Sequence, residues 1–509
     1  MTRLLPQERH VSISRSRDLP TSNQLEKLQH LLVLLPTSPT EDLWQQLPHG
    51  ELLAALTRRR PAKASVPLAS HLPGAGQTGV SIGFLKSADP LPKLQSELRK
   101  LAALVLAESP ESIGIVCLGF DDSIRKMLQS DTISALMLHA FDLPSRKSDP
   151  KPASRLRRLR VFAPAPGLDL TRIRAEVDGN NLARWLSAMP PNKLDAAGYR
   201  AAVAQLAKRE DWQMKFLDES ALRKKGAGAF LAVSQGNPTD DAGIIRLRYR
   251  PKRSKGPATL ALVGKGITFD TGGNNLKPFK GMLDMHEDMQ GSAVALGTLL
   301  ALSRIKYPHA VDCWLAVTEN RIGAKAYKSR DIVIASNGVS IEVIHTDAEG
   351  RMVLADTLAL ACNDDPACII DYATLTGACV GALTSRYSGV FSNRESLYPL
   401  LVECGADVGE RVWGFPMDAD FDEAIESSVA DVAQCSVDND GDHILAARFL
   451  GRFVDTGIPW VHIDLAASHH KGGLGLVPTS VTGFGVRLSI SLLVDHQLLE
   501  DHLAPGDDK

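Results

Sequence analysis

Short apolar runs and amphipathic stretches alternate along the first third of the chain. The run at 112–118 is apolar enough for a buried strand, whereas residues 91–106 repeat their apolar positions at helical spacing. A Pro- and Arg-rich stretch over 144–160 interrupts this alternation and predicts an exposed loop. We therefore expect a small N-terminal α/β domain over 1–166, with a domain boundary near residue 166.

The second part of the chain, 167–509, continues the alternation on a larger scale. A connecting helix is predicted at 168–189, and β-rich runs then alternate with apolar-periodic helices. This order predicts an α/β fold in which a mixed, largely parallel sheet is covered by helices on both faces. The predicted strands are 229–233, 244–249, 259–263, 310–317, 331–334, 341–344, 368–372 and 460–463, and the predicted helices are 290–303, 352–362, 377–383 and 443–454.

The composition predicts a soluble protein of the cytoplasm. Hydrophobic residues make up 44% and charged residues 23%, and the longest early apolar run, Leu31 to Leu35, is too short to span a membrane. The formal net charge of −2 gives no electrostatic reason to expect nucleic acid or an anionic membrane as a partner. The seven cysteines include no Cys-x-x-Cys pair, which is typical of reduced thiols rather than disulfides.

Lysines and carboxylates gather between the strand at 259–263 and the helix at 352–362, at spacings that suit a metal site. Lys265 and Asp270 stand five residues apart among glycines, and we expect a turn there. Asp347 and Glu349 are separated by one residue, so both side chains should project to one side of an extended segment. Carboxylates held close together repel one another unless a cation lies among them. We interpret the set as a two-metal site.

Other interpretations of these residues are weaker. The pair Gly264-Lys265 is excluded as a phosphate-binding loop, because Thr259 stands where that loop needs Gly and Gly266 follows the lysine where Ser or Thr should stand. Taken singly, Asp347 would be part of an ordinary acidic turn. The oxygen-rich donors favour Mn²⁺, Mg²⁺ or Zn²⁺.

The combined motifs resemble the leucyl aminopeptidases, the dimetal exopeptidases of the cytosol, over about residues 168 to 490. The matching segments are 264–273, 276–278, 287–289, 346–351 and 371–378. The resemblance implies five metal ligands, of which Asp270 and Glu349 bridge the two ions. These five are Lys265, Asp270, Asp288, Asp347 and Glu349.

The resemblance also implies roles for residues that do not hold metal. It makes Lys277 the catalytic group that stabilises the transition-state oxyanion, and it makes Arg351 the holder of a bicarbonate that shuttles protons. A lysine amine must lose its proton to bind a metal, so Lys265 needs a lowered pKa from the adjacent cation. The implied substrate-binding residues are Met285, Thr374, Leu375 and Gly377.

The function implied is removal of N-terminal residues from peptides, with a preference for apolar, leucine-like residues. Two divalent ions per subunit are expected, Mn²⁺ or Zn²⁺ with Mg²⁺ as an alternative, together with a homohexamer and no membrane partner. The alternative from another class is a nucleic-acid-binding or regulatory protein on the same scaffold. Salt-dependent retention on DNA, compared with hydrolysis of amino-acid amides after Mn²⁺ addition, distinguishes the two hypotheses.

Three positions depart from the family pattern. Thr271 stands where the family has Ser, Gln290 where it has a small residue, and His345 where it has Asn. Gln290 is expected to narrow the pocket or adjust metal preference. His345 is either a group that exchanges protons or a packed substitute.

Overall fold

The structure is a computed structural model that describes residues 4–7, 10–58, 67–74, 76–150, 152–252, 259–438 and 440–503. It divides into two compact units. The smaller contains Gln7–Val177 and Gly472–Ser480, and the larger contains Met1–Pro6, Asp178–Lys471 and Val481–Lys509. The division falls within helix α6 (Leu170–Ser187), which confirms the connecting helix, whereas the boundary near residue 166 stays a prediction.

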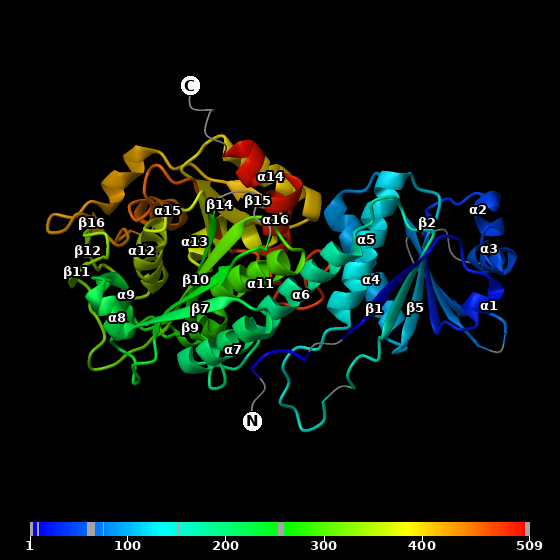
Figure 1. Ribbon diagram of the computed structural model, residues 1–509, viewed down its shortest axis with the longest axis horizontal. Coiled ribbons are helices and arrows are strands. Elements are labelled where there is room, and N and C mark those ends of the chain that lie inside the picture. Colours follow the sequence, from blue (N-terminus) through cyan, green and yellow to red (C-terminus); the bar gives the residue numbers. More distant parts are fainter. Residues whose placement is uncertain are drawn as a thin grey trace. The chain divides into compact units, whose positions relative to one another are not determined.

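The smaller unit is built on a sheet of six described strands in the order β1-β6-β5-β2-β4-β3 (Figure 1). Neighbouring strands are parallel except β3 and β4. The strands are β1 (Ser12–Ser16), β2 (His30–Pro36), β3 (Leu68–His71), β4 (Gly79–Leu85), β5 (Ser112–Cys117) and β6 (Arg158–Phe162), and the helices are α1 (Ser22–Leu25), α2 (Glu41–Gln45), α3 (Gly50–Arg58), α4 (Leu91–Leu106) and α5 (Asp122–His139). The strand predicted at 112–118 and the helix predicted at 91–106 are both confirmed.

Strand β2 is apolar from Leu31 to Leu35 because helices cover both faces of this sheet. Its residues alternate between two cores: Leu32 and Leu34 pack in the core that includes α4 and α5, while Leu31 and Val33 pack with residues of α1 to α3. Figure 1 shows α4 and α5 on one side of the sheet and α1 to α3 on the other.

The larger unit is built on a sheet of eight described strands in the order β15-β14-β17-β13-β9-β10-β8-β7. The central strands β17, β13, β9 and β10 are parallel, and antiparallel pairs flank them. The predicted mixed, largely parallel sheet is therefore confirmed. Its strands are β7 (Gln213–Asp218), β8 (Gly243–Tyr249), β9 (Thr259–Asp270), β10 (Ala310–Asn320), β13 (Cys368–Ala373), β14 (Ser388–Ser392), β15 (Val412–Gly414) and β17 (Trp460–Asp464).

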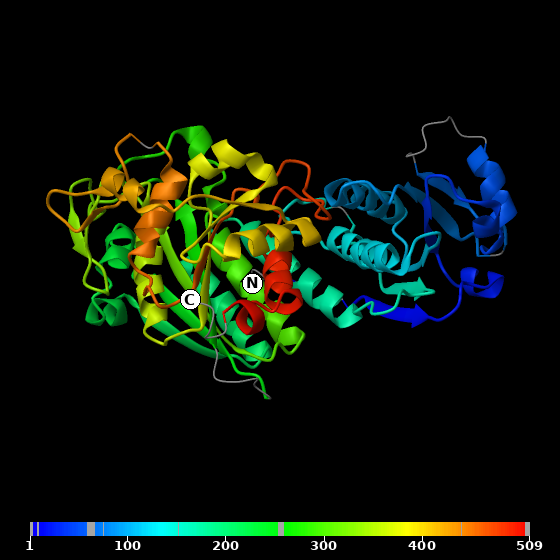
Figure 2. The ribbon, with the colours of Figure 1, turned by 90° about the horizontal axis from the view of Figure 1, so that it is seen from above.

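Helices cover both faces of this sheet, as the turned view in Figure 2 also shows. Residues of α9, α12 and α15 share one core with β9, whereas α11 packs from the other side together with α16. A small sheet of the described strands β11 (Ile332–Ile334), β12 (Ser340–Glu342) and β16 (Val432–Ala433) completes the unit. The helices are α7 (Ala196–Arg209), α8 (Glu219–Lys224), α9 (Gly228–Ser234), α10 (Phe279–Met282), α11 (Gln290–Arg304), α12 (Glu349–Cys362), α13 (Gly377–Leu383), α14 (Leu397–Val408), α15 (Asp442–Gly451) and α16 (Val486–Ile490), with short 3₁₀ or π turns at Met285–Glu287, Thr384–Arg386, Ala419–Ile425, Ser491–Asp495 and Leu498–His502.

Several predicted elements differ from the structure in kind or extent. The apolar run at 229–233, a predicted strand, is instead helix α9, because a short buried run fits either element and the Asp356 carboxylate accepts the Phe230 N–H at the start of α9. The strand predicted at 341–344 ends at Glu342 and belongs to the small sheet, not to the central one.

Candidate metal centre

Strand β9 carries two of the predicted ligands inside the central sheet. Lys265 and Asp270 both lie within the strand, so the expected turn between them is wrong: β9 continues to Asp270 and pairs there with Asn320 of β10. Helix α11 passes very close to this strand. A Cβ at Gly264 would lie 2.4 Å from the Cα of Ser292, so only glycine fits at that position.

The other predicted ligands come from loops and helix starts. Asp347 lies in a turn and Glu349 is the first residue of α12, so the expected extended segment with a helix beginning near Met352 is wrong. At the helix N-terminus the Glu349 carboxylate is stabilised by the helix dipole. Asp288 directly follows the 3₁₀ turn at Met285–Glu287 and precedes α11.

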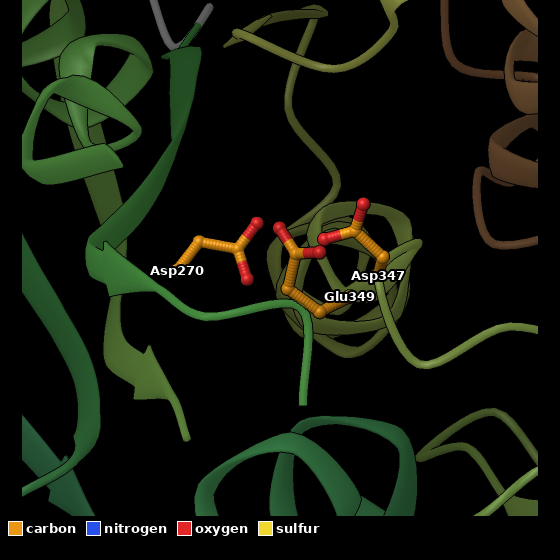
Figure 3. A group of neighbouring side chains, drawn as sticks. All are labelled: Asp270, Asp347 and Glu349. Atoms are coloured by element: carbon orange, nitrogen blue, oxygen red, sulfur yellow. The ribbon is translucent and has the colours of Figure 1, made fainter. Parts of the chain in front are cut away.

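Three of the carboxylates converge. Asp270, Asp347 and Glu349 each offer an oxygen, and these oxygens all lie within 4.8 Å of one another. Figure 3 shows the three carboxylates pointing toward one another, Asp270 from the strand and Glu349 from the start of the helix. Such an approach of like charges is costly unless positive charge lies among them.

Two lysines supply part of that positive charge, and each contacts two carboxylates. The Nζ of Lys265 lies 2.9 Å from Asp288 Oδ1 and 2.9 Å from Glu349 Oε1, and it donates a hydrogen bond to the Thr374 carbonyl. The Nζ of Lys277 lies 2.9 Å from Asp270 Oδ2 and 2.6 Å from an oxygen of Asp347. Four carboxylates thus share two ammonium groups, which leaves an excess of negative charge when all are ionised.

Burial and the excess negative charge both raise the pKa values of the acids. Burial, followed by repulsion from Asp270, raises the pKa of Glu349 to about 8 and the pKa of Asp347 to about 7. Burial also raises the pKa of Asp288, although the Lys265 ammonium opposes that shift. Additional cations would therefore find favourable sites here.

The pKa values of the two lysines are raised as well. Burial lowers the pKa of the Lys265 and Lys277 ammonium groups, but the facing carboxylates outweigh burial and raise both pKa values above their usual range. A metal that binds to the Lys265 nitrogen must therefore displace a proton, and binding should release protons to solvent.

The residues present fit a divalent cation near Lys265 and Asp288. Asp288 Oδ2 is buried and has no hydrogen-bond partner among the described residues, although a buried carboxylate oxygen is normally satisfied. Gly350 keeps the space around the lysine open, because a Cβ there would lie 2.7 Å from both Cε and Nζ of Lys265. Both observations are expected of a site that accommodates an ion.

Several side chains that hold the cluster in place were not predicted. Asn320 Nδ2 donates to Asp270 Oδ1 (2.8 Å) and to the Thr346 carbonyl (3.0 Å). It therefore links β9 to the turn that carries Asp347, which we call the ligand turn. Gln434 holds the same turn at both ends: its Oε1 accepts the N–H of His345, and its Nε2 donates to the Ala348 carbonyl. No spacing signal in the sequence distinguishes these amides from ordinary polar residues.

The predicted substrate-binding residues lie along the loop that follows β13 and in the turn before Asp288. Thr374 Oγ1 donates to Asp288 Oδ1 (2.8 Å), so this loop contacts the cluster directly. Leu375 and Met285 are half-buried. Gly377 begins α13, and a Cβ there would meet no atom within 4 Å, so open space lies in front of it.

Arg351 is fully buried, and a carboxylate that was not predicted occupies its guanidinium. Its Nη2 donates to both carboxylate oxygens of Asp442, at 2.7 and 2.8 Å, and its Nη1 donates to the Gln434 carbonyl. The resemblance implied a bicarbonate at this guanidinium, which stays a prediction; the Asp442 carboxylate contacts the Nη2 of the same group.

The three departures from the family pattern have local contacts. The Thr271 hydroxyl donates to the Asn320 carbonyl and accepts the N–H of Gly273, so its hydrogen-bonding capacity is used. Gln290 is buried and donates to Glu287. His345 is exposed, and its Nδ1 accepts the Asp347 N–H, which makes it a partner of the ligand turn rather than a packed core residue.

Comparisons with known proteins identify a family and related sequences. Residues 181–490 match the cytosol aminopeptidase family, catalytic domain. A probable cytosol aminopeptidase of Synechococcus sp. (strain CC9311) is 39% identical over 354 residues, which cover 68% of this chain and 70% of that protein. One of Prochlorococcus marinus (strain MIT 9313) is 38% identical over 353 residues, covering 68% and 71%.

Two solved structures share the fold along nearly the whole chain. A mutant of tomato leucine aminopeptidase matches with a TM-score of 0.84 and 27% identity, covering 96% of this chain and 98% of that one. The bottromycin maturation enzyme BotP in complex with Mn matches with a TM-score of 0.79 and 26% identity, covering 93% and 100%. Among the described residues, no helix is long and apolar enough to cross a membrane. By the matched catalytic domain and these relatives, the chain belongs to the cytosol aminopeptidase family.

Proposed function

We propose that this aminopeptidase removes apolar, leucine-like N-terminal residues from peptides and depends on two divalent cations held by the carboxylate cluster. The observation that carries the proposal is the excess of four carboxylates over two ammonium groups in one buried site. A site built for protein groups alone would not retain uncompensated buried charge.

The proposed ligands form two overlapping sets. Lys265 and Asp288 would hold one ion on their side of the cluster, Asp347 would hold the other, and Asp270 and Glu349 would bridge them. This assignment is supported by the ion pairs that join Lys265 to Asp288 and Glu349, and by the convergence of Asp270, Asp347 and Glu349. Divalent cations bound there would polarise the scissile carbonyl and lower the pKa of a water molecule.

Lys277 is proposed to act on the substrate rather than on the metal. Its ammonium stays protonated, because the carboxylates of Asp270 and Glu349 raise its pKa after burial has lowered it. A fixed positive charge at that position stabilises an oxyanion that develops on the carbonyl. The free amine of the substrate would also approach the cluster, and this would restrict cleavage to the amino end of a peptide.

The apolar preference is proposed from the loop after β13. Leu375 and Met285 supply half-buried apolar surface, and the open space in front of Gly377 leaves room for a side chain. Residues of this type bind an aliphatic side chain by removing its surface from water.

The test is hydrolysis of leucine p-nitroanilide before chelation, after chelation and after Mn²⁺ is restored. We expect loss and recovery of activity, and no cleavage of the N-acetylated substrate under any condition. Aspartate and lysine p-nitroanilides serve as matched substrates for the apolar preference. Retained activity in metal-free protein, or equal cleavage of the acetylated substrate, would contradict the proposal.

We further propose that the protein is a homohexamer located in the cytoplasm. Exposed apolar side chains such as Phe279 (78% exposed) and Trp413 (55% exposed) support association between copies. Multi-angle light scattering at working concentration tests the assembly, and a monomer would contradict it. The free thiols of all seven cysteines support a reducing compartment, which fractionation tests.

A further inference from the structure

The anion bound by Arg351 is part of the chain itself. Arg351 is 2% exposed, and its Nη2 reaches both oxygens of the Asp442 carboxylate. Arg–carboxylate hydrogen bonds of this kind are strong and directional, since both partners are charged. Asp442 is the first residue of α15, so the backbone places its carboxylate without help from a mobile loop.

This pair adjoins the metal centre through short covalent and hydrogen-bonded paths. Arg351 lies in the first turn of α12, two residues after Glu349. Its Nη1 donates to the carbonyl of Gln434, and the Gln434 side chain holds the turn that carries Asp347.

We propose that Asp442 is a positioning residue that fills an anion site on Arg351, so that this enzyme needs no free carbonate or carboxylate ion there. The Asp442 carboxylate holds Nη2, while Nε of Arg351 is buried and has no hydrogen-bond partner among the described residues. A free anion that bound through Nε and Nη2 would therefore compete with Asp442, and an anion tethered to a helix binds without losing translational freedom. The inference deepens the proposed function and rests on it for its effect on turnover.

The proposal predicts that shortening Asp442 uncovers the site. In Asp442→Ala the guanidinium keeps its place in α12 but loses its carboxylate partner, leaving a buried cation without compensation. A planar anion as small as formate has the chemistry of the missing group. Asp442→Asn keeps the shape of the side chain and removes its charge, so it is the matched control.

The experiment measures formate binding and turnover in the metal-loaded wild type and both variants. We expect Asp442→Ala to retain its metals and to lower kcat by about 10–100-fold, as loss of outer partners at metal sites does. Formate should bind this variant in calorimetry and restore kcat saturably, while chloride at equal ionic strength should not. The wild type and Asp442→Asn should show neither binding nor stimulation, and removal of carbonate from the buffer should leave wild-type kcat unchanged.

Three results would overturn the proposal. The first is a folded, metal-loaded Asp442→Ala variant that does not bind formate and whose kcat formate does not restore. The second is an Asp442→Asn variant with full kcat, and the third is a wild type that loses activity without carbonate and regains it with bicarbonate. The last two measurements do not depend on folding of the alanine variant. Calorimetric measurement of formate binding requires no peptide hydrolysis. It therefore tests whether Asp442 fills an anion site even if the wild type cleaves no peptide and the proposed function fails.

Discussion

The two sheets of this molecule share a construction and differ in what they bury. Both are largely parallel and carry helices on both faces, but β2 of the smaller sheet buries a continuous apolar run, whereas β9 of the larger sheet buries Lys265 and Asp270. Apolar burial stabilises each strand without any partner of special chemistry. Buried charge must be matched by other charge, and in the larger sheet that requirement assembles Asp288, Asp347 and Glu349 around the end of one strand. The layer architecture therefore positions a site, and the unmatched charge determines its chemistry.

Removing a bridging carboxylate should break the metal centre itself. Glu349→Ala is expected to lose bound metal together with nearly all activity, because Glu349 contacts Lys265 and converges with Asp270 and Asp347. The control is Asp356→Asn, which changes a buried acid on the same helix that accepts the backbone N–H groups of Phe230 and Ser336, and it should keep its metals. Elemental analysis and steady-state kinetics on both variants measure the difference. Full metal content in Glu349→Ala would show that it is no ligand.

Removing Lys277 should lower the rate of catalysis without loss of bound metal. Lys277→Ala is expected to keep both ions while kcat falls by roughly 10²–10³-fold, the usual consequence of losing one oxyanion donor. Lys280→Ala, at an exposed position three residues later, should change neither quantity. Near-normal kcat in Lys277→Ala would mean that its charge serves only to balance Asp270 and Asp347.

Removing a hydrogen bond to a ligand should weaken the site without abolishing it. Thr374→Val deletes the hydroxyl that donates to Asp288 Oδ1 and keeps the side-chain shape. We expect metal affinity to fall by about 10–100-fold, with kcat recovering at high Mn²⁺ concentration. Thr357→Val, which deletes a buried hydroxyl bonded to the Val353 carbonyl, is the control. An unchanged metal titration curve in Thr374→Val would show that the Thr374 hydroxyl does not support metal binding.

A cavity in the smaller sheet should leave the metal centre untouched. Leu34→Ala in β2 is expected to destabilise its unit by about 2–5 kcal/mol, the usual range for a buried leucine. Thermal unfolding followed by calorimetry measures the loss, and the metal content of folded protein should stay the same. A lower metal content at equal folded fraction would show that metal binding in the larger sheet depends on packing in the smaller one.

The smallest expected effect is a pH dependence of stability from a buried pair in the larger sheet. Burial lowers the pKa of His462, but the Asp371 carboxylate, 2.7 Å away, outweighs burial and raises it above the usual value. A raised pKa in the folded state stabilises the fold below the unfolded-state value of about 6.5, and this contribution is lost as pH rises through the raised pKa. The free energy of unfolding, measured with denaturant from pH 6 upward, should therefore decrease in the wild type but not in His462→Asn. The same pH dependence of this free energy in both proteins would contradict the pairing of His462 with Asp371.

Much of the fold followed from patterns that are local in sequence. Alternating strands and helices around Gly264 and Arg351 predicted the mixed sheet, and the charged residues predicted as a cluster do lie together. The prediction was wrong where a local pattern fits two elements, as at α9, and where a strand continues past a glycine, as at β9. Asp442 and Gln434 were missed because their contacts join residues 83 to 91 positions apart in the chain, which no spacing motif records.

We propose that the buried excess of carboxylates binds two divalent cations on which hydrolysis depends. The most direct test is equilibrium dialysis of chelated protein against rising Mn²⁺, with elemental analysis and leucine p-nitroanilide hydrolysis measured on the same samples. Binding should saturate at about two ions per chain, as a two-metal hydrolase requires, and activity should rise with occupancy. Saturation at one ion per chain, or full activity in samples without metal, would contradict the account.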